Sequence, residues 1–179
     1  PLSFVATANA VSHIGAIPNF VDIESSTLGM CPNKLSKYFF EIWKKKNNKV
    51  INKLTGREIS AIVPVHIFGN PANLPKLKII ADHWGIPIVE DSAEALGSWI
   101  KEGNSKMHCG LIGEAGILSF NGNKLITTGG GGVIITNNEK IAKKARHIST
   151  TAKLVHKWEF IHDEIGWNDR MPNINAALG

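Results

Sequence analysis

Lys124 is the residue whose type and surroundings best fit covalent chemistry in this sequence of 179 residues. It follows an apolar run, residues 115–120, by a short turn, and it precedes two threonines and the glycine run 129–132. Glycine removes side chains where another backbone or a ligand must come close. A lysine amine held in such a site can act as a Schiff-base nucleophile or a proton carrier. The alternatives are a surface lysine and a flexible loop; a P-loop is not favoured, because no Gly-Lys-Ser/Thr step opens a helix there.

Asp91 is the acidic counterpart of this lysine. It follows a short apolar run, residues 86–89, and Glu90. In parallel α/β sheets, ligands gather beyond the carboxyl ends of the strands, where we expect Asp91, Ser119 and Lys124 to converge. Asp91 can cap a helix, and it can also keep the ring nitrogen of a heteroaromatic cofactor protonated, so that the ring withdraws electrons from a carbanion. The two interpretations are compatible.

Short apolar runs alternate with longer helical patterns, which predicts a mostly parallel sheet covered by helices on both faces. The continuous apolar run 59–68 is typical of a strand buried on both faces. Asn73 can cap a helix that Gly85 ends, and Asn137 or Asn138 can cap a later one. The predicted strands are residues 17–23, 59–68, 86–89, 115–120 and 133–136. The predicted helices are residues 7–13, 33–46, 73–84 and 137–147, followed by a loop beyond residue 149 and a last helix.

The composition is that of an ordinary globular domain, with 43% hydrophobic and 20% charged residues. The formal net charge is +5, and much of it comes from lysines within residues 44–53, a pattern typical of a solvated surface. A basic surface favours an anionic small molecule such as a nucleotide sugar, whereas a nucleic-acid partner is not expected without an aromatic-interleaved basic motif. No apolar run is long enough to span a membrane. Cys31 and Cys109 have no metal-site spacing and set no disulfide framework, so we expect a cytoplasmic protein without a metal site.

The sequence begins and ends in the middle of patterns that are typical of secondary-structure elements. It opens at Pro1, directly in an apolar segment, and it closes at Gly179, within what reads as the start of an amphipathic helix. Its length fits one domain. We therefore expect residues 1–179 to be the central part of a longer protein.

Four segments of the sequence resemble the DegT/DnrJ/EryC1/StrS family of sugar aminotransferases, which depend on pyridoxal phosphate (PLP). They are residues 1–24 (PLSFVATANAVSHIGAIPNFVDIE), 89–98 (VEDSAEALGS), 119–132 (SFNGNKLITTGGGG) and 162–179 (HDEIGWNDRMPNINAALG). The similarity covers essentially the whole chain in order, and the pattern of serine, lysine, threonines and glycine run is highly specific. Together with residues 149–160 (STTAKLVHKWEF), it looks most like the subgroup that makes 4-amino sugars for legionaminic acid and bacillosamine.

The resemblance implies the large domain of PLP-dependent enzymes of fold type I, a three-layer α/β/α sandwich with a mostly parallel central sheet. Residues 1–179 are expected to be part of this domain, without the N-terminal segment that binds the cofactor phosphate and without the C-terminal small domain. On their own, they are expected to bind PLP weakly and to be inactive. The full enzyme is expected to be a homodimer with shared active sites, which moves an amino group from glutamate to the 4-keto carbon of a nucleotide-linked 6-deoxy sugar in cell-surface glycan biosynthesis.

The resemblance also implies roles for individual residues. Lys124 matches the lysine that holds PLP as a Schiff base and moves the proton, and Asp91 matches the partner of the pyridine nitrogen. Glu94 matches a polar position beside the ring and its hydroxyl, Ser119 a donor to the cofactor phosphate, and Phe4 an aromatic residue stacked on the ring. The last three also have ordinary structural explanations, as a helix-start carboxylate, a hydroxyl bonded to its own backbone and a core phenylalanine.

Asn168 and Arg170 match a stretch that reaches across a dimer interface towards the neighbour's cofactor phosphate. The family usually has tyrosines where this chain has Trp167 and Asp169. His66, near the carboxyl end of a predicted strand, is a weaker candidate for a substrate contact, because such a histidine is more often a satisfied polar residue.

Three rival functions remain open. PLP-dependent sugar dehydratases resemble this family with a histidine in place of the lysine, so Lys124 argues against that activity. A non-catalytic homologue that acts as a sensor or assembly partner would fold well and lack the cofactor's spectrum. A nucleotide-binding module that uses the glycine run would bind ATP rather than PLP.

Overall fold

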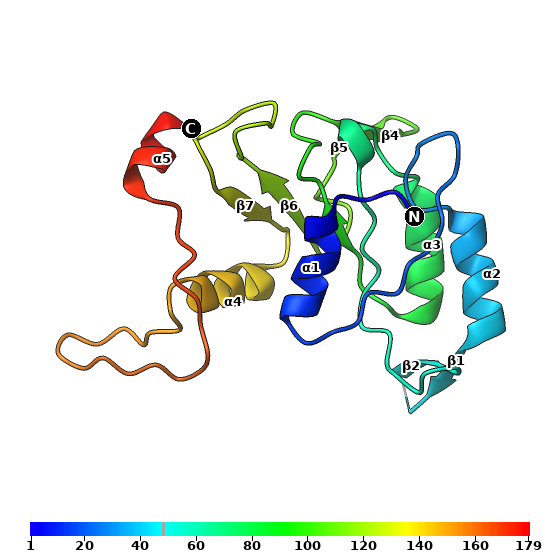
Figure 1. Ribbon diagram of the computed structural model, residues 1–179, viewed down its shortest axis with the longest axis horizontal. Coiled ribbons are helices and arrows are strands. Elements are labelled where there is room, and N and C mark those ends of the chain that lie inside the picture. Colours follow the sequence, from blue (N-terminus) through cyan, green and yellow to red (C-terminus); the bar gives the residue numbers. More distant parts are fainter. Residues whose placement is uncertain (48) are drawn as a thin grey trace.

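The computed structural model describes residues 1–47 and 49–179, which form a mixed α/β fold (Figure 1). The helices are α1 (Val5–His13), α2 (Pro32–Ile42), α3 (Leu74–Trp84), α4 (Glu139–Ser149) and α5 (Asn173–Leu178), with a short 3-10 turn at Ile67–Gly69. The strands are β1 (Trp43–Lys46), β2 (Lys49–Asn52), β3 (Val89–Asp91), β4 (Trp99–Glu102), β5 (Ser105–His108), β6 (Ala115–Ser119) and β7 (Gly132–Ile135).

A small central sheet has the strand order β3-β6-β7. β3 and β6 are parallel, with Asp91 opposite Ile117, whereas β7 runs antiparallel to β6, with Gly132 opposite Ser119. Parallel pairing brings the carboxyl ends of β3 and β6 to one edge of the sheet. The predicted parallel arrangement is therefore confirmed for this pair, while β7 makes the sheet mixed.

The strand predicted at residues 17–23 is wrong. Ile23 makes an isolated bridge with Met30, and the rest of the run is irregular. Ile17 and Phe20 are exposed over 60% and 57% of their surface. The apolar pattern of this segment therefore does not reflect burial in the sheet.

The strand predicted at residues 59–68 is only partly present. Ile62 makes an isolated parallel bridge with Ile88, just before β3, and Val65 makes one with Asp91 of β3. This segment therefore does run along the sheet. Pro64 lies between them and has no N–H to donate. The proline explains why the segment makes single bridges instead of a continuous ladder.

The helix predicted to continue to Lys46 ends at Ile42. β1 begins at the next residue and pairs with β2 in an antiparallel hairpin. Trp43 is buried where the helix ends, in an aromatic cluster with Phe39 of α2 and Trp84 at the end of α3. This cluster favours an abrupt change from helix to strand, and neither this hairpin nor the β4–β5 hairpin was expected from sequence patterns.

The core lies between α2, α3 and the sheet, and Figure 1 shows the two helices side by side. Leu35, Phe39, Leu74 and Leu77 are exposed over at most 1% of their surface. Full burial of such a side chain contributes roughly 1.5–3 kcal/mol. α3 ends as predicted at Gly85, whose φ of 71° lies in the left-handed region that glycine adopts without strain.

The part of the chain after β7 is more exposed. α4 begins where the Asn138 side chain accepts hydrogen bonds from the N–H groups of Lys140 and Ile141, at 3.0 and 3.4 Å, which confirms the predicted cap. Every residue of α4 and α5 is at least partly exposed. Between them, residues 150–172 form a long irregular segment that extends away from the sheet (Figure 1). The helices described are all too short or too polar to cross a membrane.

Candidate active site

Lys124 lies just beyond β6, in the turn that follows the strand. Its N–H donates to the carbonyl of Asn121 at 3.0 Å, which closes the turn. Its side chain is only 13% exposed, and Nζ lies 3.2 Å from Oε1 of Glu94. The edge of the sheet therefore holds a mostly sheltered amine beside the more exposed carboxylate of Glu94.

Glu94 links this lysine to the loop that follows residue 66. Its second oxygen, Oε2, accepts a hydrogen bond from the N–H of Phe68 at 3.0 Å. Phe68 has a φ of 53°, in the left-handed region that is unfavourable for a bulky side chain. A Cβ on Gly69 would lie 2.7 Å from the carbonyl oxygen of Glu94, so the loop can approach this closely only with glycine. Backbone strain of this kind clusters at binding and catalytic sites.

Asp91 lies on the same edge, at the end of β3. Its Oδ2 accepts a hydrogen bond from the Thr7 hydroxyl at 2.6 Å, and its Oδ1 accepts one from the N–H of Ala93 at 3.1 Å. Parallel pairing with β6 places Asp91 near Ser119, the last residue of that strand. The structure thus brings Asp91, Ser119 and Lys124 to one edge of the sheet, while their roles stay predictions.

Glu90, the neighbour of Asp91 on β3, is fully buried. Its carboxylate accepts a hydrogen bond from the ring of His66 at 3.0 Å. It also accepts three from backbone N–H groups, at 2.6, 2.7 and 2.6 Å, those of Gly110, Ile112 and Gly113. Burial raises the pKa of the Glu90 carboxyl, but the hydrogen bonds from His66 and the backbone outweigh this effect and keep the pKa below its ordinary value.

His66 belongs to this buried network. Its Nδ1 accepts the N–H of Ala72 at 3.0 Å, so the ring hydrogen is on Nε2 and is donated to Glu90. Both ring nitrogens are engaged, and the residue is 1% exposed. This geometry supports the alternative of a satisfied polar residue rather than a substrate contact. Nearby, burial and the negative charge of Glu90 raise the pKa of the Cys109 thiol to about 12.

Ser119 and Phe4 lie on elements that border the cluster. The Ser119 hydroxyl accepts the N–H of Asn121, two residues further on, at 3.3 Å. Phe4 precedes α1, three residues before Thr7, and is 73% exposed. This exposure argues against a core role for Phe4 and leaves its ring accessible to a ligand.

Asn168 and Arg170 lie on the irregular segment between α4 and α5. Asn168 makes an isolated antiparallel bridge with Thr150, just after α4, and Arg170 is exposed. Among the contacts described for residues 1–47 and 49–179, neither joins the cluster around Lys124. Their approach to a neighbouring subunit stays a prediction.

The glycine run 129–132 folds back along β6. The N–H of Phe120 donates to the carbonyl of Gly131 at 2.9 Å, and a Cβ on Gly132 would lie 2.7 Å from the carbonyl oxygen of Leu118. The run leads into the strand β7, whereas a phosphate-binding loop of the P-loop type opens a helix. The structure therefore argues against the nucleotide-binding alternative.

Thr7, Phe68 and Glu90 take part in this region although sequence patterns do not single them out. Thr7 is 84 residues away from Asp91 in the sequence, so only folding joins them. The sequence did contain one signal for Glu90, which is that two acids follow each other at the end of a predicted strand. Because side chains alternate along a strand, Glu90 and Asp91 must point to opposite sides.

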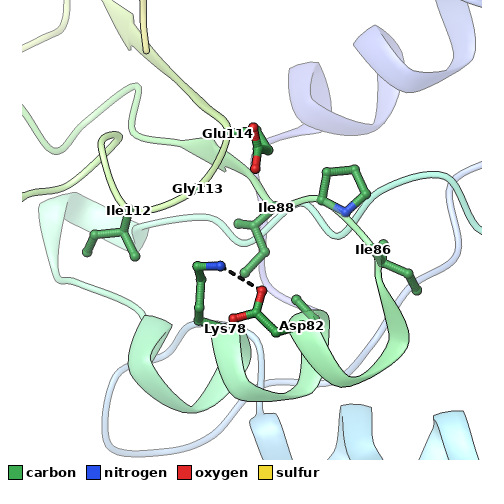
Figure 2. Close-up of a pocket in the computed structure, with 9 residues that line it drawn as sticks. Lys78, Asp82, Ile86, Ile88, Ile112, Gly113 and Glu114 are labelled. Atoms are coloured by element: carbon green, nitrogen blue, oxygen red, sulfur yellow. Dashed lines mark hydrogen bonds and ion pairs between the residues drawn. The ribbon is translucent and has the colours of Figure 1, made fainter. Parts of the chain in front are cut away.

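A small pocket lies elsewhere, beside α3 (Figure 2). It is lined in part by Ile86 and Ile88, which precede β3, and Lys78 and Asp82 form an ion pair with an N–O distance of 2.6 Å at its wall. The pocket thus borders the N-terminal approach to β3, whereas Asp91 ends this strand. We therefore place the candidate site at the carboxyl edge of the sheet and not in this pocket.

The fold and the site define an α/β protein with a sheltered lysine and two carboxylates at the carboxyl edge of its sheet. The chain belongs to the DegT/DnrJ/EryC1/StrS aminotransferase family, whose sequence profile matches residues 1–179. This match confirms the resemblance seen in the sequence.

Two curated relatives and two solved structures illustrate the similarity. The chain is 38% identical to the putative pyridoxal phosphate-dependent aminotransferase EpsN of Bacillus subtilis, over 99% of the chain and 42% of the relative. It is 33% identical to the GDP-perosamine synthase of Escherichia coli O157:H7, over 99% of the chain and 43% of the relative. A DegT DnrJ EryC1 StrS aminotransferase from Brucella abortus superposes with a TM-score of 0.80 at 29% identity, over 98% of the chain and 43% of that structure. Helicobacter pylori PseC, an aminotransferase involved in the biosynthesis of pseudoaminic acid, gives a TM-score of 0.80 at 28% identity, over 99% and 43%. The chain therefore spans less than half the length of these proteins.

Proposed function

We propose that residues 1–179 form the cofactor-binding part of a PLP-dependent aminotransferase, which moves an amino group from glutamate to the 4-keto carbon of a nucleotide-linked 6-deoxy sugar. The observation that carries the proposal is the ion pair between the mostly buried Lys124 side chain and Glu94, at the same edge of the sheet as Asp91, in a chain of this family. The names of the relatives support the substrate class, since one is a GDP-perosamine synthase and a structural neighbour, DesI, was solved with its TDP-sugar product.

The groups at the sheet edge fit this cofactor. An aldehyde needs an amine, a pyridine nitrogen needs an acid, and a phosphate needs hydrogen-bond donors. Lys124 supplies the amine, Asp91 the acid and Ser119 a hydroxyl, with the carboxylate of Glu94 next to the amine. When bound, PLP withdraws electrons from the carbon that loses its proton.

The chain's own residues then have distinct tasks. Nζ of Lys124 binds the cofactor and afterwards carries the proton between the two reacting carbons, and Glu94 orients this amine at 3.2 Å. Asp91 would keep the ring nitrogen protonated, and the ring of Phe4, which is 73% exposed, would cover one face of the cofactor. Ser119 would donate to the cofactor phosphate.

The proposal extends to the whole protein. Residues 1–179 would be part of the large domain, a three-layer α/β/α sandwich, and the rest of the protein would supply the segment that binds the cofactor phosphate and the small domain. The enzyme would be a cytoplasmic homodimer in cell-surface glycan biosynthesis, with Asn168 and Arg170 serving the neighbour's cofactor phosphate. Relatives more than twice as long as this chain support the expectation that further segments complete the enzyme.

A labelling experiment on the full-length protein tests the function. PLP is added, the complex is reduced with borohydride, and peptides are analysed by mass spectrometry; we expect the cofactor on Lys124. Glutamate should then release 2-oxoglutarate from the unreduced complex, and the sugar product should carry nitrogen from glutamate. A cofactor on another lysine, or a sugar product without the amino group, as a dehydratase would make, would contradict the proposal.

A further inference from the structure

The carboxylate of Asp91 is hydrogen-bonded to a residue near the start of the sequence, 84 positions away. Oδ2 of Asp91 accepts the Thr7 hydroxyl at 2.6 Å, and Oδ1 accepts the N–H of Ala93 at 3.1 Å. A carboxylate with one donor on each oxygen cannot rotate without losing a hydrogen bond. The Ala93 contact is local, because it lies two residues further on, whereas the Thr7 contact joins α1 to β3.

Thr7 is well suited to hold this carboxylate. Its β-branched side chain has few χ1 rotamers, so fixing its hydroxyl costs little side-chain conformational entropy. A threonine in a helix can instead bond to a backbone carbonyl one turn earlier, but this hydroxyl donates to Asp91. Every residue of α1 is at least partly exposed, and the hydrogen bond from Thr7 to Asp91 joins this helix to β3.

We propose that Thr7 is a positioning residue for the amino-transfer site: it fixes the Asp91 carboxylate in the direction in which that acid meets a ring nitrogen. This inference rests on the function proposed above. A hydrogen bond to the carboxylate sets its orientation before a ligand enters. Such preorganisation lowers the cost of ordering the site on binding. Thr7 itself touches Asp91 and takes no part in proton transfer.

Three variants of the full-length protein test the inference. Thr7→Val keeps the shape of the side chain and removes the donor, Thr7→Ser keeps the donor, and Ser12→Ala removes an exposed hydroxyl from the same helix, where it bonds to the Ala8 carbonyl at 3.1 Å. We expect Thr7→Val to weaken PLP binding roughly tenfold, equivalent to about 1.4 kcal/mol. Thr7→Ser should recover most of the affinity, and Ser12→Ala should match the wild type.

Two further measurements separate positioning from stability. The thermal midpoint of the cofactor-free protein should be nearly the same in all variants. The pH at which the absorbance of bound PLP changes should rise in Thr7→Val by up to about one unit, because a ring that is less firmly protonated withdraws fewer electrons from the nitrogen that links it to the lysine. A change in general stability would not move this midpoint.

The outcomes distinguish the two proposals. If the wild type shows no lysine-bound cofactor, the proposed function fails. If the wild type binds PLP and Thr7→Val binds it equally well, the role of Thr7 is refuted. Equal losses in Thr7→Val and Thr7→Ser, or a loss that follows the thermal midpoint, would also refute it, because the hydroxyl would then not be the group that acts.

Discussion

Two neighbouring carboxylates on β3, Glu90 and Asp91, lie in opposite environments. Glu90 is fully buried and accepts hydrogen bonds from His66 and from three backbone N–H groups. Asp91 is partly exposed and accepts one hydrogen bond on each oxygen, from Thr7 and Ala93. Glu94, three residues on, is 39% exposed and accepts from Lys124 and Phe68.

The difference separates structural support from chemistry. A carboxylate whose lone pairs are all taken by fixed donors holds those donors in place, as Glu90 holds the loop before β6. A carboxylate that borders solvent and retains free lone pairs can still meet a ligand. One strand therefore supplies the anchor of the loop on one side and the candidate site on the other.

Replacement of Lys124 should have the largest effect. We expect Lys124→Ala to lower transamination by at least about 1,000-fold, because it removes both the nucleophile and the proton carrier. The fold should persist, since a partly exposed ion pair contributes no more than about 1 kcal/mol. The measurements are the 2-oxoglutarate assay and thermal unfolding, with Lys78→Ala, whose lysine pairs with Asp82 on α3, as the matched control. Retained transamination in Lys124→Ala would show that the sheet edge around Lys124 is not the catalytic site.

The reactivity of the Cys109 thiol measures how well the side of β3 around Glu90 is protected from solvent. Its pKa of about 12, against an ordinary value of 9.0, makes its thiolate roughly 1,000-fold scarcer than in an unfolded chain near neutral pH. We expect alkylation of the native protein at pH 8 to be slower at Cys109 by at least this factor than alkylation in urea. Peptide mass spectrometry measures both rates. Equal rates in the two conditions would show that the side of β3 around Glu90 opens to solvent.

Removal of the charge at Glu90 should destabilise the fold. Glu90→Gln replaces an acceptor by an amide NH₂ that faces backbone donors, and we expect a loss of about 2–4 kcal/mol in the free energy of unfolding. Glu94→Gln, which changes a partly exposed carboxylate, should cost less than about 1 kcal/mol. Urea unfolding of both variants measures the difference. Similar losses for the two substitutions would contradict the division between support and site.

The smallest expected effect is a change in the pH dependence of stability. Because the pKa of Glu90 is lowered in the folded state, its contribution is fully present above the unfolded value of 4.5 and is lost as the pH falls through the folded pKa. The unfolding free energy of the wild type should therefore fall below about pH 4.5. Glu90→Gln should show a flatter profile there when urea unfolding is measured across this pH range, and an unchanged slope would contradict the role of Glu90.

Local sequence signals correctly predicted the helix ends that are set by a single capping or terminating residue. Gly85 ends α3, and Asn138 caps α4, because each acts on backbone groups within a few residues. The strand predicted at 17–23 and the continuation of α2 to Lys46 failed for the opposite reason. Whether an apolar run pairs in a sheet, or a helix continues past Ile42, depends on what the rest of the chain packs against it.

The candidate site shows the same division. Lys124 and Asp91 were singled out because each follows an apolar run by a short step, and the parallel pairing of β3 and β6 then places both at one edge. Thr7 was not singled out, and the hydrogen-bond partner of His66 could not be assigned in this way. Their partners, Asp91 and Glu90, lie 84 and 24 residues away in the sequence.

By itself, the sequence determined the family, the α/β class and the residue types available for chemistry, because these depend on motifs and on periodicity within short windows. Only the tertiary structure decided which of the two acids on β3 anchors a loop, and that Glu94, beyond the strand, pairs with the amine of Lys124. Burial and hydrogen bonding are set by segments that meet when the chain folds, and these determine whether a carboxylate is saturated or still open to a ligand.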